Sequence, residues 1–205
     1  MSASVWTAVW LSVKVAAWCT VLATPVAVPL GYVLARKRFV GRSALALLLF
    51  VPLVLPPVVT GFMLLSVFRP EGFLGGLGVP FTFAACVVAS FVVSLPLYTL
   101  AVRQTFEAVD PKYEEVARTL GEPPARAFWR VTLPLALPGV LAGATLAFAR
   151  ALGEFGATAV LAGNVEGETR TIALAVYTLM EAPDGDADAR SLVMASVLIC
   201  GVAVL

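Results

Sequence analysis

The sequence predicts an all-α membrane protein, a single domain over residues 1–205 with about five transmembrane helices. Of its 205 residues, 60% are hydrophobic and 13% are charged, whereas soluble domains contain about 45–50% apolar and about 25% charged residues. Mean hydropathy is +0.94. Apolar residues are gathered in runs long enough to cross a bilayer, which takes about 20 residues. A soluble globular fold is therefore excluded.

The apolar runs define the expected spans, which are residues 5–35, 44–68, 81–106, 131–161 and 191–205. The first four are long enough to span. The fifth has only 15 residues before the given sequence stops, so we expect its helix to continue past Leu205. Residues 171–180 are apolar but too short to cross, which favours a re-entrant or interfacial segment.

Loop charges predict the orientation. The connection after the first span carries four basic residues and no acid, and the connection over residues 107–130 is also rich in basic residues. The loop before the last span is acidic, with Glu166, Glu168, Glu181, Asp184, Asp186 and Asp188. Because Lys and Arg accumulate on the cytoplasmic side, we expect the N-terminus and the acidic loop outside and the C-terminus in the cytoplasm.

Several chemistries are excluded by missing residues. The chain has no histidine, which removes Ser-His-Asp catalysis and His metal sites. None of the three lysines, Lys14, Lys37 and Lys112, follows a glycine, so no phosphate-binding P-loop is possible. The net charge of +1 gives no case for a nucleic-acid partner. We therefore expect no catalytic residue, no metal and no cofactor in this chain, and any energy source must lie on another subunit.

A short amphipathic helix is predicted within the 107–130 connection. Asp110 is a favourable N-cap, Pro111 suits the first helical position, and Gly121 suits the position just after a helix end. An apolar stripe with helical spacing is formed by Tyr113, Val116, Ala117 and Leu120. The stripe can pack on the same chain or on a partner.

This segment resembles the EAA signature of ABC importer permeases. The motif residues are Glu115, Val116, Ala117 and Gly121, followed after nine residues by Val131, Leu133 and Pro134. The spacing is fully kept, while Val116 and Val131 replace the usual Ala and Ile. The resemblance implies the type I ABC importer permease fold and a coupling helix that docks on a cytoplasmic ATPase, where ATP would bind. A surface helix without a partner is the alternative.

The fourth span contains both small and charged residues. Gly139, Gly143 and Ala147 recur every four residues, which favours close packing of another helix. Arg150 and Glu154 lie one helical turn apart within the apolar run, where charges are costly and usually face an interior or aqueous cavity. They are either a structural ion pair or part of a translocation pathway in which Arg150 supplies positive potential for an anion.

Three stretches resemble bacterial molybdate permeases in particular: residues 52–59, 148–158 and 163–172 with 177–179. That resemblance covers nearly the whole chain and implies a multi-pass protein of the bacterial plasma membrane, surrounded by lipid. It also implies a homodimer, two copies of an ATPase and an extracytoplasmic oxyanion-binding protein. Sulfate or tungstate in place of molybdate remains open, as does a scaffold subunit without transport. An intramembrane enzyme is disfavoured because Glu154 is the one acid placed within a span, and aspartyl catalysis needs a carboxylate pair.

Overall fold

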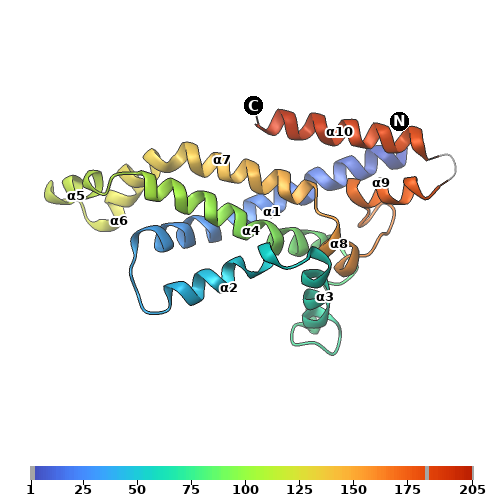
Figure 1. Cartoon of the computed structure of the whole chain (residues 1–205), viewed down its shortest axis with the longest axis horizontal. Helices are drawn as coiled ribbons and strands as arrows, with labels where there is room; N and C mark the ends of the chain where they lie inside the picture. The colour runs from blue at the N-terminus through green and yellow to red at the C-terminus, as the bar shows by residue number, and fades with distance from the viewer. Residues whose placement is uncertain (1–2, 183–184, 205) are drawn as a thin grey trace.

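The computed structural model describes residues 3–182 and 185–204, and within these ranges it contains helices and turns but no β-strand. Three long helices form the body of the fold: α1 (Ala3–Arg36), α4 (Phe83–Ala108) and α7 (Leu133–Leu152). Each of the three packs against the other two. Figure 1 shows them running side by side along the length of the molecule.

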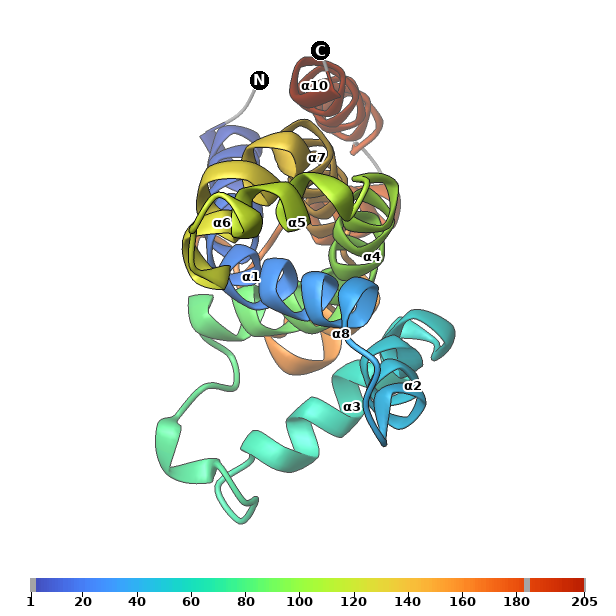
Figure 2. The same cartoon turned by 90° about the vertical axis from the view of Figure 1, so that its left-hand side faces the viewer.

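The shorter elements cover the sides and ends of this body. They are α2 (Arg42–Val54), α3 (Pro57–Phe68), η1 (Gly75–Leu77), α5 (Lys112–Thr119), α6 (Pro124–Ala127), η2 (Phe128–Thr132), α8 (Gly156–Leu161), α9 (Ile172–Met180) and α10 (Asp186–Val204). Figure 1 places α5 and α6 at one end of the bundle and α8 and α9 at the other. Figure 2, viewed from the α5 end, shows α2 and α3 to one side of the bundle and α10 on the opposite side.

Small residues explain how closely the three long helices approach. Ala16, Cys19, Ala23 and Ala27 of α1 follow helical spacing and are fully buried. On α7, a Cβ at Gly143 would lie 3.0 Å from the Tyr98 ring of α4, and one at Gly139 would overlap Thr105. The small-residue face predicted for the fourth span is therefore confirmed as the contact with α4.

The second apolar run is not one straight helix. It divides into α2 and α3, whose axes are bent by 113°. Pro56 and Pro57 lie at the break, and because proline has no backbone N–H, neither can continue the hydrogen bonding of α2. The span expected over 44–68 is therefore divided between two helices, and the pair forms either a broken span or a re-entrant loop.

The fourth apolar run also has different limits from those expected over 131–161. Helical structure begins at Pro124, passes through a π-helical turn in η2 and continues as α7 to Leu152, and α8 then forms a separate short helix. The last helix begins at Asp186 rather than at residue 191. Asp184 of the acidic loop and Leu205 at the end of the fifth run lie outside the described residues.

Within the described ranges, three helices are long and apolar enough to cross a membrane: residues 4–36, 83–108 and 124–152. The bent α2–α3 pair adds a fourth if it forms one span. α10, described as far as Val204, is not among them, so the expected fifth span stays a prediction. α9, with 9 residues, agrees with the short segment expected at 171–180.

Candidate functional site

The amphipathic helix expected in the 107–130 connection is α5. Asp110 Oδ1 accepts the backbone N–H of Lys112 at 2.9 Å, which caps the start of the helix. At the other end Gly121 has φ 94°, its N–H donates to Arg118 O at 3.1 Å, and the N–H of Glu122 donates to Ala117 O at 3.1 Å. These two bonds form a Schellman motif. The predicted start and stop signals are thus confirmed.

The apolar stripe of α5 is divided between two surroundings. Ala117 is buried in a helix that packs against α6 and η2, whereas Tyr113, Val116 and Leu120 are 58%, 57% and 81% exposed. Glu115 is also exposed and borders a cleft of about 480 Å³, whose other lining residues include Gly121 and Glu122. The outer face of α5 is therefore an apolar surface open to another protein.

The second half of the EAA-like motif begins the long helix that follows. Val131 lies in the π-helical turn η2, and Leu133 and Pro134 open α7. α5 packs against η2, so the fold brings the two halves of the motif together. Glu122 strengthens the connection because its carboxylate pairs with Arg126 at 3.4 Å and Arg130 at 3.0 Å.

The inner face of α5 holds a carboxylate that the sequence pattern did not single out. Glu114 accepts hydrogen bonds from the Tyr32 hydroxyl of α1 at 3.3 Å and the Thr132 hydroxyl of η2 at 3.1 Å. The available signal was its position three residues before the buried Ala117, on the same side of the helix. Tyr32 and Thr132 carry no local signal, because their roles depend on contacts between distant segments.

Arg150 and Glu154 form the expected ion pair, with 2.7 Å between Arg150 Nη1 and Glu154 Oε2. They are not on one helix, however, because α7 ends at Leu152 and Glu154 lies in the connection to α8. Glu154 is 2% exposed, and its Oε1 accepts the backbone N–H of Ala157 at 2.7 Å. The Arg150 side chain is 29% exposed, so the pair is buried mainly on the Glu154 side.

The two helix breaks lie against each other. A Cβ on Gly156, at the start of α8, would be 2.9 Å from Pro57 Cβ and 3.1 Å from the backbone nitrogen of Val58. A Cβ on Gly61 of α3 would be 2.8 Å from Ala157 Cα. Residues 52–59 and 148–158, which share the permease resemblance, are thus joined through α3 and α8.

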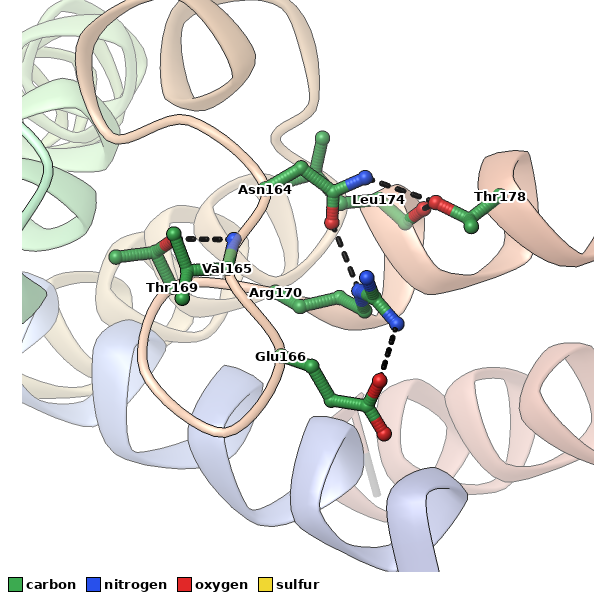
Figure 3. Close-up of polar contacts among 7 residues, drawn as sticks. All are labelled: Asn164, Val165, Glu166, Thr169, Arg170, Leu174 and Thr178. Atoms are coloured by element: carbon green, nitrogen blue, oxygen red, sulfur yellow. Dashed lines mark hydrogen bonds and ion pairs between the residues drawn. The ribbon is translucent and has the colours of Figure 1, made fainter.

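The third stretch with that resemblance forms a hydrogen-bonded loop between α8 and α9 (Figure 3). Arg170 Nε donates to Asn164 Oδ1 at 2.9 Å, and its Nη1 pairs with Glu166 at 3.0 Å. Asn164 Nδ2 in turn donates to the Thr178 hydroxyl of α9 at 2.8 Å. Thr169 Oγ1 accepts the backbone N–H of Val165 at 3.0 Å. The loop is therefore fixed to α9, at the opposite end of the bundle from α5 (Figure 1).

No group of three or more His, Cys, Asp or Glu side chains within residues 3–182 and 185–204 is arranged to hold a metal ion. Cys19 and Cys86 are free and buried, and Cys200 is free and half-buried.

Comparisons with known proteins agree with this geometry. Residues 27–205 match the family described as "Binding-protein-dependent transport system inner membrane component". The molybdenum transport system permease protein ModB of Escherichia coli K12 is 42% identical over 98% of this chain and 90% of its own. The ModB protein of Mycobacterium tuberculosis is 46% identical over 97% of this chain and 77% of its own.

Solved structures show the same fold at low identity. The MetNI methionine ABC transporter in an inward-facing conformation matches with a TM-score of 0.72 and 18% identity, covering 99% of this chain and 94% of that one. A bacterial ABC transporter for the acidic polysaccharide alginate matches with a TM-score of 0.75 and 15% identity, covering 99% of this chain and 78% of that one. The chain therefore belongs to the family of binding-protein-dependent transport system inner membrane components, as a multi-pass membrane protein with the type I ABC importer permease fold.

Proposed function

We propose that the chain is the membrane-spanning permease subunit of an ATP-driven importer that moves molybdate into the cytoplasm by alternating access. The main observation in support of this function is the 40–46% identity to molybdenum permeases over nearly the full chain. The permease itself makes and breaks no bonds, because ATP binds and is hydrolysed on a separate ATPase subunit. Sulfate or tungstate carried by the same machinery is the alternative substrate.

The resemblance to ABC importer permeases implies the partners, and two surfaces of the molecule support them. The exposed face of α5, with Tyr113, Val116 and Leu120, suits an apolar cleft on the ATPase. A second copy of the chain completes the permease, with two ATPase copies below it and lipid around it. The acidic loop bearing Glu166 and Glu168 would repel a free dianion, and delivery by an extracytoplasmic binding protein removes that difficulty.

Arg150 is the basic residue best suited to the anion pathway. A dianion in a region of low dielectric constant needs compensating positive potential. Arg150 lies at the end of α7 with part of its side chain open, and Glu154 fixes its position. Lys14 is the competitor, but its side chain is exposed and its ammonium lies 5.3 Å from the centre of the Trp10 ring. Such a position suits the membrane interface.

Reconstitution tests the function directly. The chain, its genomically adjacent ATPase and the adjacent binding protein are placed in proteoliposomes, and molybdate, tungstate and sulfate are offered separately. We expect the ATPase to copurify with the chain, and molybdate-loaded binding protein to stimulate ATP hydrolysis and uptake. Absence of ATPase association would favour a scaffold role, and uptake of sulfate alone would reassign the substrate.

A further inference from the structure

We propose that Glu114 is the positioning residue that transmits movement of α5 to the two membrane helices α1 and α7. The inference rests on the proposed importer function, because it concerns how the ATPase would drive the permease. It adds a residue outside the EAA-like motif, on the face of α5 that points away from the proposed ATPase surface.

One carboxylate joins three separate elements. Glu114 lies on α5, Tyr32 near the end of α1, and Thr132 at the end of the π-helical turn that leads into α7. The Tyr32 hydroxyl lies 3.3 Å and 3.4 Å from the two carboxylate oxygens, and the Thr132 hydroxyl lies 3.1 Å from one of them. Glu114 therefore connects α5 to both helices at once.

The partners of Glu114 are themselves held in place. The Tyr32 ring packs edge-on against Phe128, with centroids 4.8 Å apart, and against Phe106 at 5.3 Å. Thr132 is buried. A displacement of Glu114 is therefore passed to fixed groups and is not absorbed by mobile side chains.

Positive charge surrounds this carboxylate. Arg36, Lys37 and Arg118 line a cavity of about 170 Å³ together with Tyr32, Pro111, Glu114 and Glu115. The carboxylate thus lies at a cavity lined by three cations and faces two hydroxyl donors.

The other contacts of α5 with the rest of the chain are less directional than the hydrogen bonds of Glu114. Ala117 is its one buried residue, and a methyl group can slide over its neighbours, whereas hydrogen bonds fix both distance and direction. α7 is 20 residues long, or about 30 Å, and ends beside the Arg150–Glu154 pair. A shift at Thr132 can therefore reach the far end of the proposed pathway through a single helix.

The test measures the coupling ratio, the number of ATP molecules hydrolysed per molybdate transported, in the reconstituted complex. Glu114→Ala removes the acceptor, Glu114→Gln keeps an acceptor oxygen, and Tyr32→Phe combined with Thr132→Val removes both donors. Glu71→Ala and Thr145→Val are matched controls, since Glu71 is an exposed acid and the exposed Thr145 hydroxyl bonds only within its own helix, to Leu141 O.

We expect Glu114→Ala and the double variant to bind the ATPase and hydrolyse ATP while the coupling ratio rises at least about tenfold, the scale of losing one or two hydrogen bonds. Glu114→Gln and both controls should stay within about threefold of the wild type.

A wild-type coupling ratio in Glu114→Ala overturns the inference, even if hydrolysis and uptake fall in parallel, because a purely structural role lowers both equally. If Glu114→Ala does not assemble, the double variant decides by the same ratio. A wild-type chain that never binds the ATPase would instead overturn the proposed function.

Discussion

The Arg150 guanidinium donates to the Glu154 carboxylate at 2.7 Å across the point where α7 ends. Because the second carboxylate oxygen accepts the Ala157 N–H at 2.7 Å, Glu154 links the end of α7 to the start of α8. The pair therefore has a structural role in the helix break, and its proposed pathway role needs variants that separate the two.

Neutralising Arg150 alone and then both residues distinguishes the structural role from the pathway role. Arg150→Gln leaves a buried carboxylate without its cation and should lower the free energy of unfolding by about 2–4 kcal/mol. In the double variant, with Glu154→Gln added, the amide oxygen can still accept the Ala157 N–H, so we expect most of the stability to return. Molybdate uptake by the double variant should still fall at least about tenfold if Arg150 supplies the pathway potential. Thermal unfolding in detergent and proteoliposome uptake measure the two effects.

The control for this experiment is the more exposed pair Arg103–Glu107, which has the same spacing and a distance of 2.8 Å. Its double neutralisation should cost less than about 1 kcal/mol. Uptake at the wild-type rate by the Arg150–Glu154 double variant would rule out the pathway role and leave the structural one.

Gly121 should be needed for its backbone conformation and not for space. Its φ of 94° is costly for a β-branched residue, yet a Cβ there would meet no atom within 4 Å. Gly121→Val should therefore insert into the membrane normally but lose binding-protein-stimulated ATP hydrolysis, with a local cost of about 1–2 kcal/mol. Gly121→Asn should retain activity, because Asn tolerates the left-handed region. Gly76→Val is the control at an equally open position without positive φ. Wild-type hydrolysis in Gly121→Val would contradict the coupling assignment.

The contact between α3 and α8 should be intolerant of a single methyl group. In Gly61→Ala the new Cβ would lie 2.8 Å from the Ala157 backbone, which cannot rotate away. We expect a loss of about 1–3 kcal/mol and impaired uptake. Gly201→Ala on α10, where a Cβ meets no atom within 4 Å, should be neutral or stabilising by up to about 1 kcal/mol. Equal melting temperatures for Gly61→Ala and the wild type would show that α3 is free to move away.

Local signals in the sequence located elements well where they depend on neighbouring residues. The limits of α5 follow from Asp110 and Gly121, whose roles are set within one helical turn. The face of α7 that packs on α4 follows from Gly139 and Gly143 in the same way. Membrane-spanning length is equally local, because the bilayer imposes it on each run separately.

Contacts between distant segments could not be predicted from local sequence patterns. Glu114 and Tyr32 are 82 positions apart, and no local pattern in either segment indicates that the two residues are in contact. The α2–α3 break has a local signal in Pro56 and Pro57. The length of the apolar run nevertheless favoured a single span, because both helices are apolar. The break after Leu152 likewise separates Arg150 from Glu154, although their spacing fits one helical turn. The four-residue spacing therefore predicted the ion pair correctly, but not that Glu154 lies beyond the end of α7.

Orientation in the membrane is the remaining prediction, and the structure determines where it should be probed. Gly185 is a poor site for a cysteine, because a Cβ there would overlap the carbonyl of Leu179. Glu168 in the loop before α9 and Ser43 at the start of α2 are both exposed. With Cys200 replaced by alanine, the other native cysteines, Cys19 and Cys86, are buried and should not react. We expect Glu168→Cys to react with a membrane-impermeant maleimide in intact cells, and Ser43→Cys to react only after permeabilisation, because the basic first connection favours the cytoplasm. The reverse labelling pattern would place α5 outside the cell, where no ATPase could reach Tyr113, Val116 and Leu120.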